Sequence, residues 1–416
     1  TLAKQLHEAL PSSHILHSDM PDGEAFQQWT QFLSKDTGCL ITTKIGAWLA
    51  TASDLVLLHE PEQDDHKQDE STPRYDARRV LLWCAEHSLT EVQSYGLTPP
   101  LHSEKEAPAL EAPLVHIHHP QGRSKIRMLQ ADSVQALLDH SGSRIIVHSI
   151  SGSLSRLICR DCNWQAACPA CTSGLGADHG QALCRVCRKR STMPDHCPVC
   201  GGVDLSKSLP GIDRLQTEWQ TQFPDSPVEW RTLTAETLEA PLPTGCLVVV
   251  TDAAWISVGE DIRKRERQCI ALRRLIDRVS NVQGTLILQC QETFASLLSD
   301  WLTVDGMKRF VQDTCEERHT FEYPPSKRVV KMIFHGEEAT AEEARYKIDQ
   351  ALRTHYAWDI HWRGPMPIQH QNVTRGKRMI VHAVFPPGTP EQTLIEAFTP
   401  YAKEATIDLD PIAFLR

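Results

Sequence analysis

The chain has 416 residues, of which 41% are hydrophobic and 23% charged, and its formal net charge is −10. This length is enough for two or three domains, each with its own core. No apolar run approaches the roughly 18 residues of a membrane span, and the first residues do not resemble a signal peptide. We therefore expect a cytoplasmic protein with no membrane partner. The negative charge argues against a uniformly basic nucleic-acid binder but leaves room for local basic clusters.

Apolar strands alternate with helices from residue 1 to about residue 290, and this alternation predicts parallel sheets covered on both faces. Residues 61–73 are acidic and polar and predict a loop. Residues 99–113 are rich in Pro and Glu and predict a linker. We expect strands at 14–17, 39–42, 55–58, 114–118, 144–148, 246–251 and 284–290, and helices near 1–9, 24–34, 76–87, 131–140, 212–222 and 261–280.

A new α+β unit is predicted from about residue 323. Its expected strands are 328–334, 358–363, 378–385 and 405–409, and its expected helices are 341–354 and 390–402. The fold class is therefore α/β, followed by a C-terminal α+β domain.

Eight of the 14 cysteines form four Cys-x-x-Cys pairs between residues 159 and 200. Two cysteines at this spacing can grip one metal ion from a tight turn, and two pairs complete a tetrahedral Cys₄ site. Zinc suits four thiolates best, so four pairs predict two zinc ions. Disulfides or a catalytic redox pair are the alternatives, and adjacent pairs are not typical of either. The pairs are Cys159/Cys162, Cys168/Cys171, Cys184/Cys187 and Cys197/Cys200.

Three basic clusters are predicted as DNA contacts, because phosphates require only positive charge at reachable spacing. The alternative for each cluster is an ordinary solvated surface. The clusters are Arg188, Lys189 and Arg190; Arg263, Lys264 and Arg265; and Arg375, Lys377 and Arg378.

Several local motifs, in order, resemble the replication restart protein PriA family (primosomal protein N′). They include the words Cys-Arg-Asp-Cys at 159–162, Cys-Pro-Ala-Cys at 168–171 and Cys-Pro-Val-Cys-Gly at 197–201. Others are Leu-His-Ser at 16–18, Tyr-Pro-Pro at 323–325, Gly-Pro at 364–365 and Ile-Asp-Leu-Asp-Pro at 407–411. Each motif is weak alone, and the specificity comes from their order and spacing.

The resemblance implies two RecA-like helicase lobes with a double-zinc module inserted into the second lobe. Residues 1–105 would be part of the first lobe, 106–158 and 203–300 the second lobe, 159–202 the zinc module, and 301–416 a helical connection with the C-terminal domain. One zinc would be held by Cys159, Cys162, Cys197 and Cys200, and the other by Cys168, Cys171, Cys184 and Cys187. The chain begins at Thr1 without the family's phosphate loop, so we expect an N-terminally truncated chain.

The ATPase motifs of the family are altered in this sequence. Where the family has Asp-Glu-Glu-His, residues 59–62 begin with His59 and Glu60, and histidine is a poor ligand for Mg²⁺. Asp64 and Asp65, about five residues further on, are weaker candidates to replace the Mg²⁺-holding aspartate. In the second lobe Arg278 survives, but Asn281 replaces the final arginine, and losing one such arginine typically costs about 10³-fold in rate. The pattern resembles the degenerate, helicase-deficient branch known in actinobacteria. The sequence leaves open whether ATP with Mg²⁺ is a cofactor in addition to the two zinc ions.

Our first hypothesis is a PriA-like protein that binds branched or single-stranded DNA at stalled forks and promotes primosome assembly and helicase loading without its own ATPase. Its expected partners are primosome and helicase-loading proteins and the single-stranded DNA-binding protein. One alternative is an active ATP-dependent 3′-5′ DNA helicase of superfamily 2 with diverged motifs. A second alternative is a zinc-bearing protein-interaction scaffold, which the net charge of −10 favours weakly.

Overall fold

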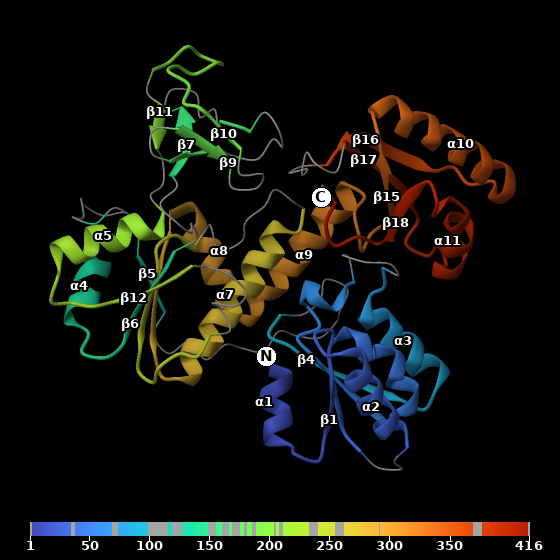
Figure 1. Cartoon of the computed structure of the whole chain (residues 1–416), viewed down its shortest axis with the longest axis horizontal. Coiled ribbons are helices and arrows are strands. Elements are labelled where there is room, and N and C mark those ends of the chain that lie inside the picture. The colour runs from blue at the N-terminus through green and yellow to red at the C-terminus, as the bar shows by residue number, and fades with distance from the viewer. Residues whose placement is uncertain are drawn as a thin grey trace.

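A computed structural model shows four units, built from separate sheets (Figure 1). The first unit lies at the bottom of the view, a five-stranded parallel sheet at the left, the cysteine-rich module at the top and the C-terminal unit at the right. No helix in the described part of the chain is both long and apolar enough for a membrane span. The structure describes residues 2–34, 38–68, 74–98, 115–118, 126, 128–148, 155–159, 166–168, 175–178, 181–184, 189–203, 205–207, 211–232, 240–253, 262–290, 292–368 and 377–414.

The first unit contains two separate pairs of parallel strands. Strand β1 (His14–Leu16) pairs with β2 (Leu40–Thr42), and β3 (Leu55–His59) pairs with β4 (Glu91–Tyr95). Helices α1 (Leu2–Ala9), α2 (Asp22–Leu33) and α3 (Ala77–His87) and the 3₁₀ segments η1 (Lys44–Ala52) and η2 (Asp64–His66) complete the unit. A small core joins β3 and β4 to η1 and α3 and includes Ala47, Ala50, Ala77, Leu81 and Cys84.

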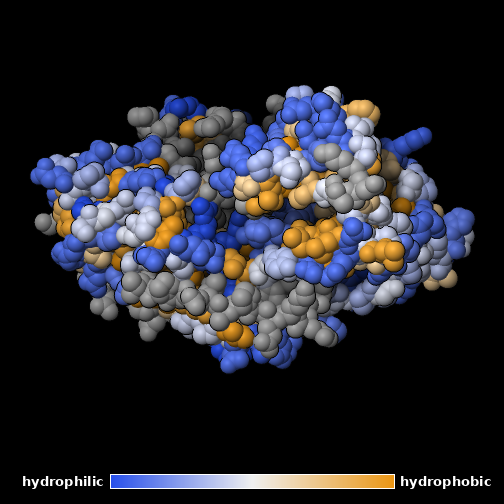
Figure 2. Space-filling view, turned by 90° about the horizontal axis from the view of Figure 1, so that it is seen from below, coloured by the Kyte–Doolittle hydropathy of each residue, from blue (hydrophilic) through white to orange (hydrophobic). Residues whose placement is uncertain are grey.

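The prediction of a sheet covered on both faces is wrong for this unit among the residues that the structure describes. Burial alternates along β3, so only its Val56 and Leu58 face the core. Leu55 and Leu57 point the other way and are 48% and 61% exposed. Figure 2 looks at the molecule from below the view of Figure 1, and orange apolar areas lie near the middle of this face.

The second unit is built on the five-stranded sheet, which confirms the expected parallel architecture. Its strand order is β12 (Glu229–Thr232), β6 (Arg144–His148), β13 (Leu247–Val250), β14 (Thr285–Gln289), β5 (Val115–His118), and all neighbours are parallel. Strands β6, β13 and β14 are apolar runs buried on both faces, as parallel strands between helices must be.

Helices cover the two faces of this sheet according to the alternation of side chains. Ile146, Val249 and Ile287 pack with residues of α4 (Ala131–Asp139) and α5 (Ile212–Gln222). On the other face, Val248 and Leu286 pack with α7 (Lys264–Asn281) and α8 (Glu292–Leu302). Helix α7 therefore has a buried side against the sheet, and its other side can meet the remaining units.

Helix α9 (Val304–Thr320) packs against the core of the parallel-sheet unit through Met307 and Phe310. The C-terminal unit that follows is an antiparallel sheet of order β16 (His361–Pro367), β17 (Arg378–Phe385), β15 (Arg328–His335), β18 (Ala405–Leu409). Helices α10 (Glu338–Tyr356) and α11 (Glu391–Phe398) pack on one face, over a core that includes Met332, Ile348 and Leu394. The strand expected at 358–363 instead spans β16, because α10 runs to Tyr356 and ends at Ala357 in a left-handed conformation.

The cysteine-rich module is a small antiparallel sheet of order β10 (Arg190–Thr192), β9 (Gln181–Cys184), β8 (Leu175–Asp178), β7 (Ser155–Cys159), β11 (Leu205–Lys207). In the chain it lies between β6 and α5, two elements of the five-stranded sheet. Its core is small and contains Leu157, Cys168, Leu175 and Cys184. Such a small core favours additional cross-links, such as metal ions.

Candidate functional sites

The segment from Cys197 to Gly202 forms a tight turn that brings two thiols together. The Gly201 amide donates to the Cys197 carbonyl at 2.9 Å, and the Cys197 amide donates to the Gly202 carbonyl at 2.8 Å. Gly201 has φ of +71°, a conformation that side chains other than glycine rarely adopt. The sequence Cys-Pro-Val-Cys-Gly thus specifies its own turn.

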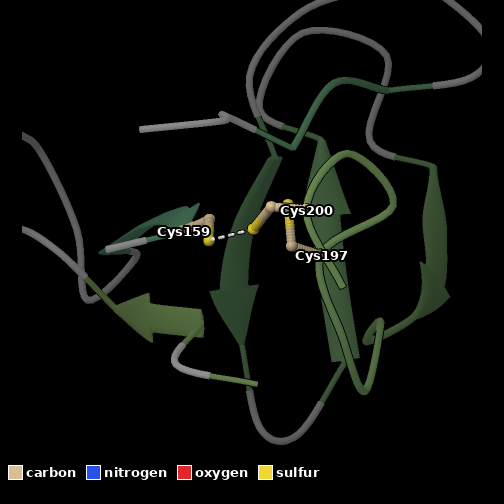
Figure 3. Close-up of side chains that lie close together, drawn as sticks. All are labelled: Cys159, Cys197 and Cys200. Carbon is tan, nitrogen blue, oxygen red and sulfur yellow. Dashed lines mark hydrogen bonds between the residues drawn. The ribbon is translucent and has the colours of Figure 1, made fainter. Parts of the chain in front are cut away.

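Cys159 approaches this turn from the end of β7, where its backbone pairs with Leu205 of β11. Its Sγ lies 3.6 Å from Sγ of Cys200 (Figure 3). Four thiolates at about 2.3 Å from a tetrahedral zinc stand roughly 3.8 Å apart, so this spacing fits a shared ion. Cys159 and Cys197 are buried, whereas Cys200 is exposed.

These three sulfurs lie within 4.8 Å of one another, and they are the one such group of potential metal ligands among the residues that the structure describes. No disulfide joins the described cysteines. Soft thiolate donors in this arrangement can hold a metal ion, and they favour zinc over Mg²⁺ or Ca²⁺. Cys162, the fourth expected ligand, lies outside the described residues.

The second expected zinc set is described only in part. Cys168 and Cys184 are buried in the same small core. The Cys184 amide donates to the Lys189 carbonyl at 3.0 Å. Cys171 and Cys187 lie outside the described residues.

The altered ATPase positions follow β3 and lie close to helix α7. Glu60 pairs with Arg274 of α7 at 2.9 Å. Asp64 pairs with Arg263 at 2.5 Å and with Arg267 at 2.8 Å. The carboxylates of Glu60 and Asp64 are therefore bound to guanidinium groups from the second unit.

His66, Arg278 and Asn281 also form hydrogen bonds within the protein. The ring Nε2 of His66 lies 3.1 Å from the carbonyl of His59 and 3.0 Å from that of Glu60. Arg278 donates to the Ala240 carbonyl at 2.8 Å, and Asn281 donates to Asp277 at 3.0 Å. The surviving arginine thus contacts its own unit, and its neighbour Arg274, one turn earlier, makes the contact to Glu60.

Glu62 stands in the same segment after β3 and is 5% exposed. Its Oε1 accepts hydrogen bonds from the amides of Leu97 at 3.1 Å and Thr98 at 3.4 Å. Burial raises the pKa of this carboxyl group above its ordinary value. A Cβ on Gly96 would collide with Glu62 Oε2 and would lie 2.9 Å from Pro61 Cδ, so the glycine allows this close packing.

The predicted DNA-contacting residues fall on three separate elements. Lys189 and Arg190 are exposed at the start of β10, and Lys264 and Arg265 are exposed at the start of α7, whereas Arg263 is paired with Asp64. Lys377 is exposed and pairs with Glu337 at 2.7 Å, and Arg378 begins β17. Arg188 and Arg375 lie outside the described residues. The exposed basic side chains of β10 and α7 have the access that phosphate contacts require.

No protein-family model matches the chain. Curated relatives do match it, and they include replication restart proteins PriA from several bacteria. The protein from Haemophilus influenzae is 22% identical over 407 residues, which covers 85% of this chain and 55% of the relative. The protein from Chlamydia pneumoniae is 24% identical over 392 residues, 79% of this chain and 52% of the relative. The chain is thus distantly similar to PriA proteins over most of its length.

The match to the PriA family is partial along the relatives. The PriA protein of Bacillus subtilis is 22% identical over 237 residues, 51% of this chain and 29% of that protein. The chain thus spans about half of the length of the Haemophilus and Chlamydia relatives, and less of the Bacillus one.

In this PriA relative, sequence reasoning missed Arg267 and Arg274, which hold the residues after β3. Both follow Arg263 at helical spacing on α7, and the acidic partners Glu60 and Asp64 stand in the polar segment after β3. The opposite charges of these two segments could have indicated that they pair. The segments are about 200 residues apart in the sequence, however, so their contact does not follow from local pattern.

Proposed function

We propose that the chain acts in replication restart: it binds branched or single-stranded DNA at stalled forks and promotes primosome assembly and helicase loading. The observation that carries this proposal is the cysteine cluster of Cys159, Cys197 and Cys200, in a chain whose curated relatives are PriA proteins. The proposed partners are primosome and helicase-loading proteins and the single-stranded DNA-binding protein.

Two zinc ions are part of the proposal. Cys159, Cys162, Cys197 and Cys200 would hold one, and the spacing of the three described sulfurs supports that set. Cys168, Cys171, Cys184 and Cys187 would hold the other, and the shared burial of Cys168 and Cys184 supports it. Zinc would supply the cross-links that this small module otherwise lacks.

The proposed organisation is two RecA-like lobes, with 1–105 as part of the first lobe and 106–158 with 203–300 as the second. Residues 159–202 would be the zinc module and 301–416 the helical connection and C-terminal domain. The five-stranded parallel sheet with helices on both faces supports the second lobe.

We propose further that the chain does not hydrolyse ATP. The carboxylates of Glu60 and Asp64 neutralise arginines of α7 and would have to leave those partners before they could bind Mg²⁺. Arg278 donates to a carbonyl of its own unit, which supports the same conclusion.

Salt-dependent binding of forked DNA tests the DNA-binding part of the proposal. Lys264 and Arg265 are exposed at the start of α7, so the double variant Lys264→Ala/Arg265→Ala removes charge without removing a described ion pair. We expect weaker binding and a reduction of about 2 in the slope of log K against log salt, about 1 for each lost phosphate contact. Lys347→Ala, which removes an exposed lysine of α10, is the matched control and should leave the slope unchanged. Equal slopes for all three proteins would contradict this DNA-binding surface, and absence of binding by the unaltered protein would favour a zinc-bearing scaffold.

A further inference from the structure

A buried carboxylate joins the first unit to the C-terminal unit. Asp408 of β18 is 1% exposed. Its carboxylate lies 3.0 Å from Nζ of Lys67 in the first unit and 3.6 Å from Nζ of Lys331 in β15. The side chains of both lysines are also buried, at 2% and 3% exposed. Arg74 of the first unit approaches the same carboxylate at 3.4 Å.

A second group of ion pairs lies two residues further along the chain. Asp410 pairs with Arg79 of α3 at 2.6 Å and with Arg328 of β15 at 2.7 Å. Arg79 also pairs with Glu391 of α11. The Lys67 Nζ donates in addition to the Leu409 carbonyl at 2.8 Å. The first unit is thus tied to β18, to Asp410 directly after it and to α11 of the C-terminal unit.

Helix α7 connects the second unit to both of the others. Besides the pairs with Glu60 and Asp64, its Arg267 donates to the Ile412 carbonyl at 2.7 Å. Arg273 is fully buried and donates to the carbonyl of Leu97 in the first unit at 2.9 Å and to that of Trp301 in α8 at 2.5 Å. Each of the three units therefore contacts the other two through charged groups.

We propose that these contacts form an ion-pair clamp that holds the three units in one fixed arrangement, which nucleotides do not change. The clamp is defined as Glu60, Asp64, Asp408 and Asp410 with their basic partners Lys67, Arg74, Arg79, Arg263, Arg267, Arg274, Arg328 and Lys331. The proposal concerns the shape of the protein and does not depend on its role in replication.

The energetic reason is the burial of the charges at the centre of the clamp. Separating the units would take Lys67 away from Asp408 and leave that carboxylate with Lys331 of its own unit. Losing one partner of a buried pair typically lowers a folding equilibrium by more than about a hundredfold. A ligand could open the clamp only by binding the open form better by a similar factor. At the altered ATPase positions, Glu60 and Asp64 already pair with arginines of the second unit, so these two carboxylates would have to leave them before holding the Mg²⁺ of a nucleotide.

Single-molecule energy transfer between dyes on different units tests the clamp in the whole chain. Exposed Leu89 in the first unit, Gln216 in α5 and Gln350 in α10 offer attachment points through encoded non-natural residues, which leaves the cysteines untouched. For the pairs 89/216 and 89/350 we expect one narrow distribution of transfer efficiency, with the same mean in buffer, Mg·ADP, Mg·ATP and a non-hydrolysable ATP analogue. A second population or a shifted mean in any nucleotide would overturn the proposal.

A variant that weakens the clamp at its partly exposed pairs gives the complementary result. Asp64 and Arg79 have side chains 26% and 40% exposed, so Asp64→Asn/Arg79→Gln should fold. We expect broader efficiency distributions and at least about tenfold faster hydrogen exchange at amides between the units. Lys347→Gln, which breaks an exposed pair on α10, is the control and should match the unaltered protein. If the double variant also kept one narrow distribution, the ion pairs would not be what fixes the arrangement.

Discussion

The substitution Asp408→Asn should strongly destabilise the C-terminal unit. At 3.0 Å and an effective dielectric constant of about 20, the Coulomb attraction between Asp408 and Lys67 is about 5.5 kcal/mol, and desolvation of both groups opposes it. Removing one partner of a buried pair costs about 3–5 kcal/mol, because the other charge is left buried. The amide keeps the shape and one acceptor oxygen, so we expect the lower end of this range, about 3 kcal/mol.

Native-state hydrogen exchange of the amides in β15 and β18 measures this cost without assuming that the whole chain unfolds in one step. A loss of about 3 kcal/mol corresponds to about hundredfold faster exchange. Glu343→Gln removes an acid whose pair with Lys347 is exposed, and it should leave these rates unchanged. An increase below about tenfold for Asp408→Asn would refute the reasoning that this carboxylate is a buried counter-charge.

A second prediction concerns zinc: elemental analysis should find about two ions per chain, with one lost in Cys159→Ser and one lost in Cys184→Ser. Cys246→Ser alters a buried cysteine in the core of the parallel sheet and, as the control, should lose none. Full zinc content in Cys159→Ser would contradict the proposed ligand set. A third concerns His382, whose pKa is lowered to about 4 by burial, and also by nearby Lys331 and Arg363. In the unfolded chain this histidine is protonated below its ordinary pKa of about 6.5, whereas in the folded protein it stays neutral down to about pH 4. Its contribution to the free energy of unfolding is therefore present above pH 6.5 and should fall by about 2 kcal/mol between pH 7 and pH 5. His382→Gln should remove this loss in urea titrations, and an identical loss in the variant would refute the assignment. A fourth is that Gly96→Ala destabilises the first unit by about 1–3 kcal/mol, because the methyl group collides with Glu62. A Cβ at Gly23 would meet open space, so the control variant Gly23→Ala should unfold at a temperature no lower than that of the unaltered protein.

Most of the regular elements were predictable because their patterns are local. The apolar runs of β6, β13 and β14 specify buried parallel strands. The turn at Cys197–Gly201 is likewise local, since two cysteines at fixed spacing and a glycine at positive φ specify it together. These are the parts of the fold and of the candidate metal centre that sequence reasoning could predict.

Seven of the described strands were missed: the five short strands β7 to β11 of the cysteine-rich module, and β4 and β12, which carry a weak apolar signal. Strand β4 has the sequence Glu-Val-Gln-Ser-Tyr and β12 has Glu-Trp-Arg-Thr, and each lies at the edge of its described sheet. Edge strands meet water on one side, so polar residues are tolerated there. The exposed face of β3 was not predictable either, because an apolar run does not say which of its two faces is covered.

The contacts around the ATPase-like positions could not be predicted, because they join distant segments. Lys67 and Asp408 are more than 300 residues apart in the chain, and Asp64 and Arg263 about 200. Sequence reasoning identified the loss of an aspartate at His59, but it could not show that the neighbouring carboxylates pair with α7. Charge alone predicts a solvated loop at 61–73, and only the assembled fold brings the arginines to it.

The most direct test of our account is ATP hydrolysis by the zinc-loaded protein on forked DNA, measured together with binding of the same DNA. The account predicts salt-sensitive binding of the fork and no increase in hydrolysis when DNA is added, both in this chain and in the longest natural form of the protein. DNA-stimulated hydrolysis in that longest form would contradict the central claim and would favour an active helicase with diverged motifs.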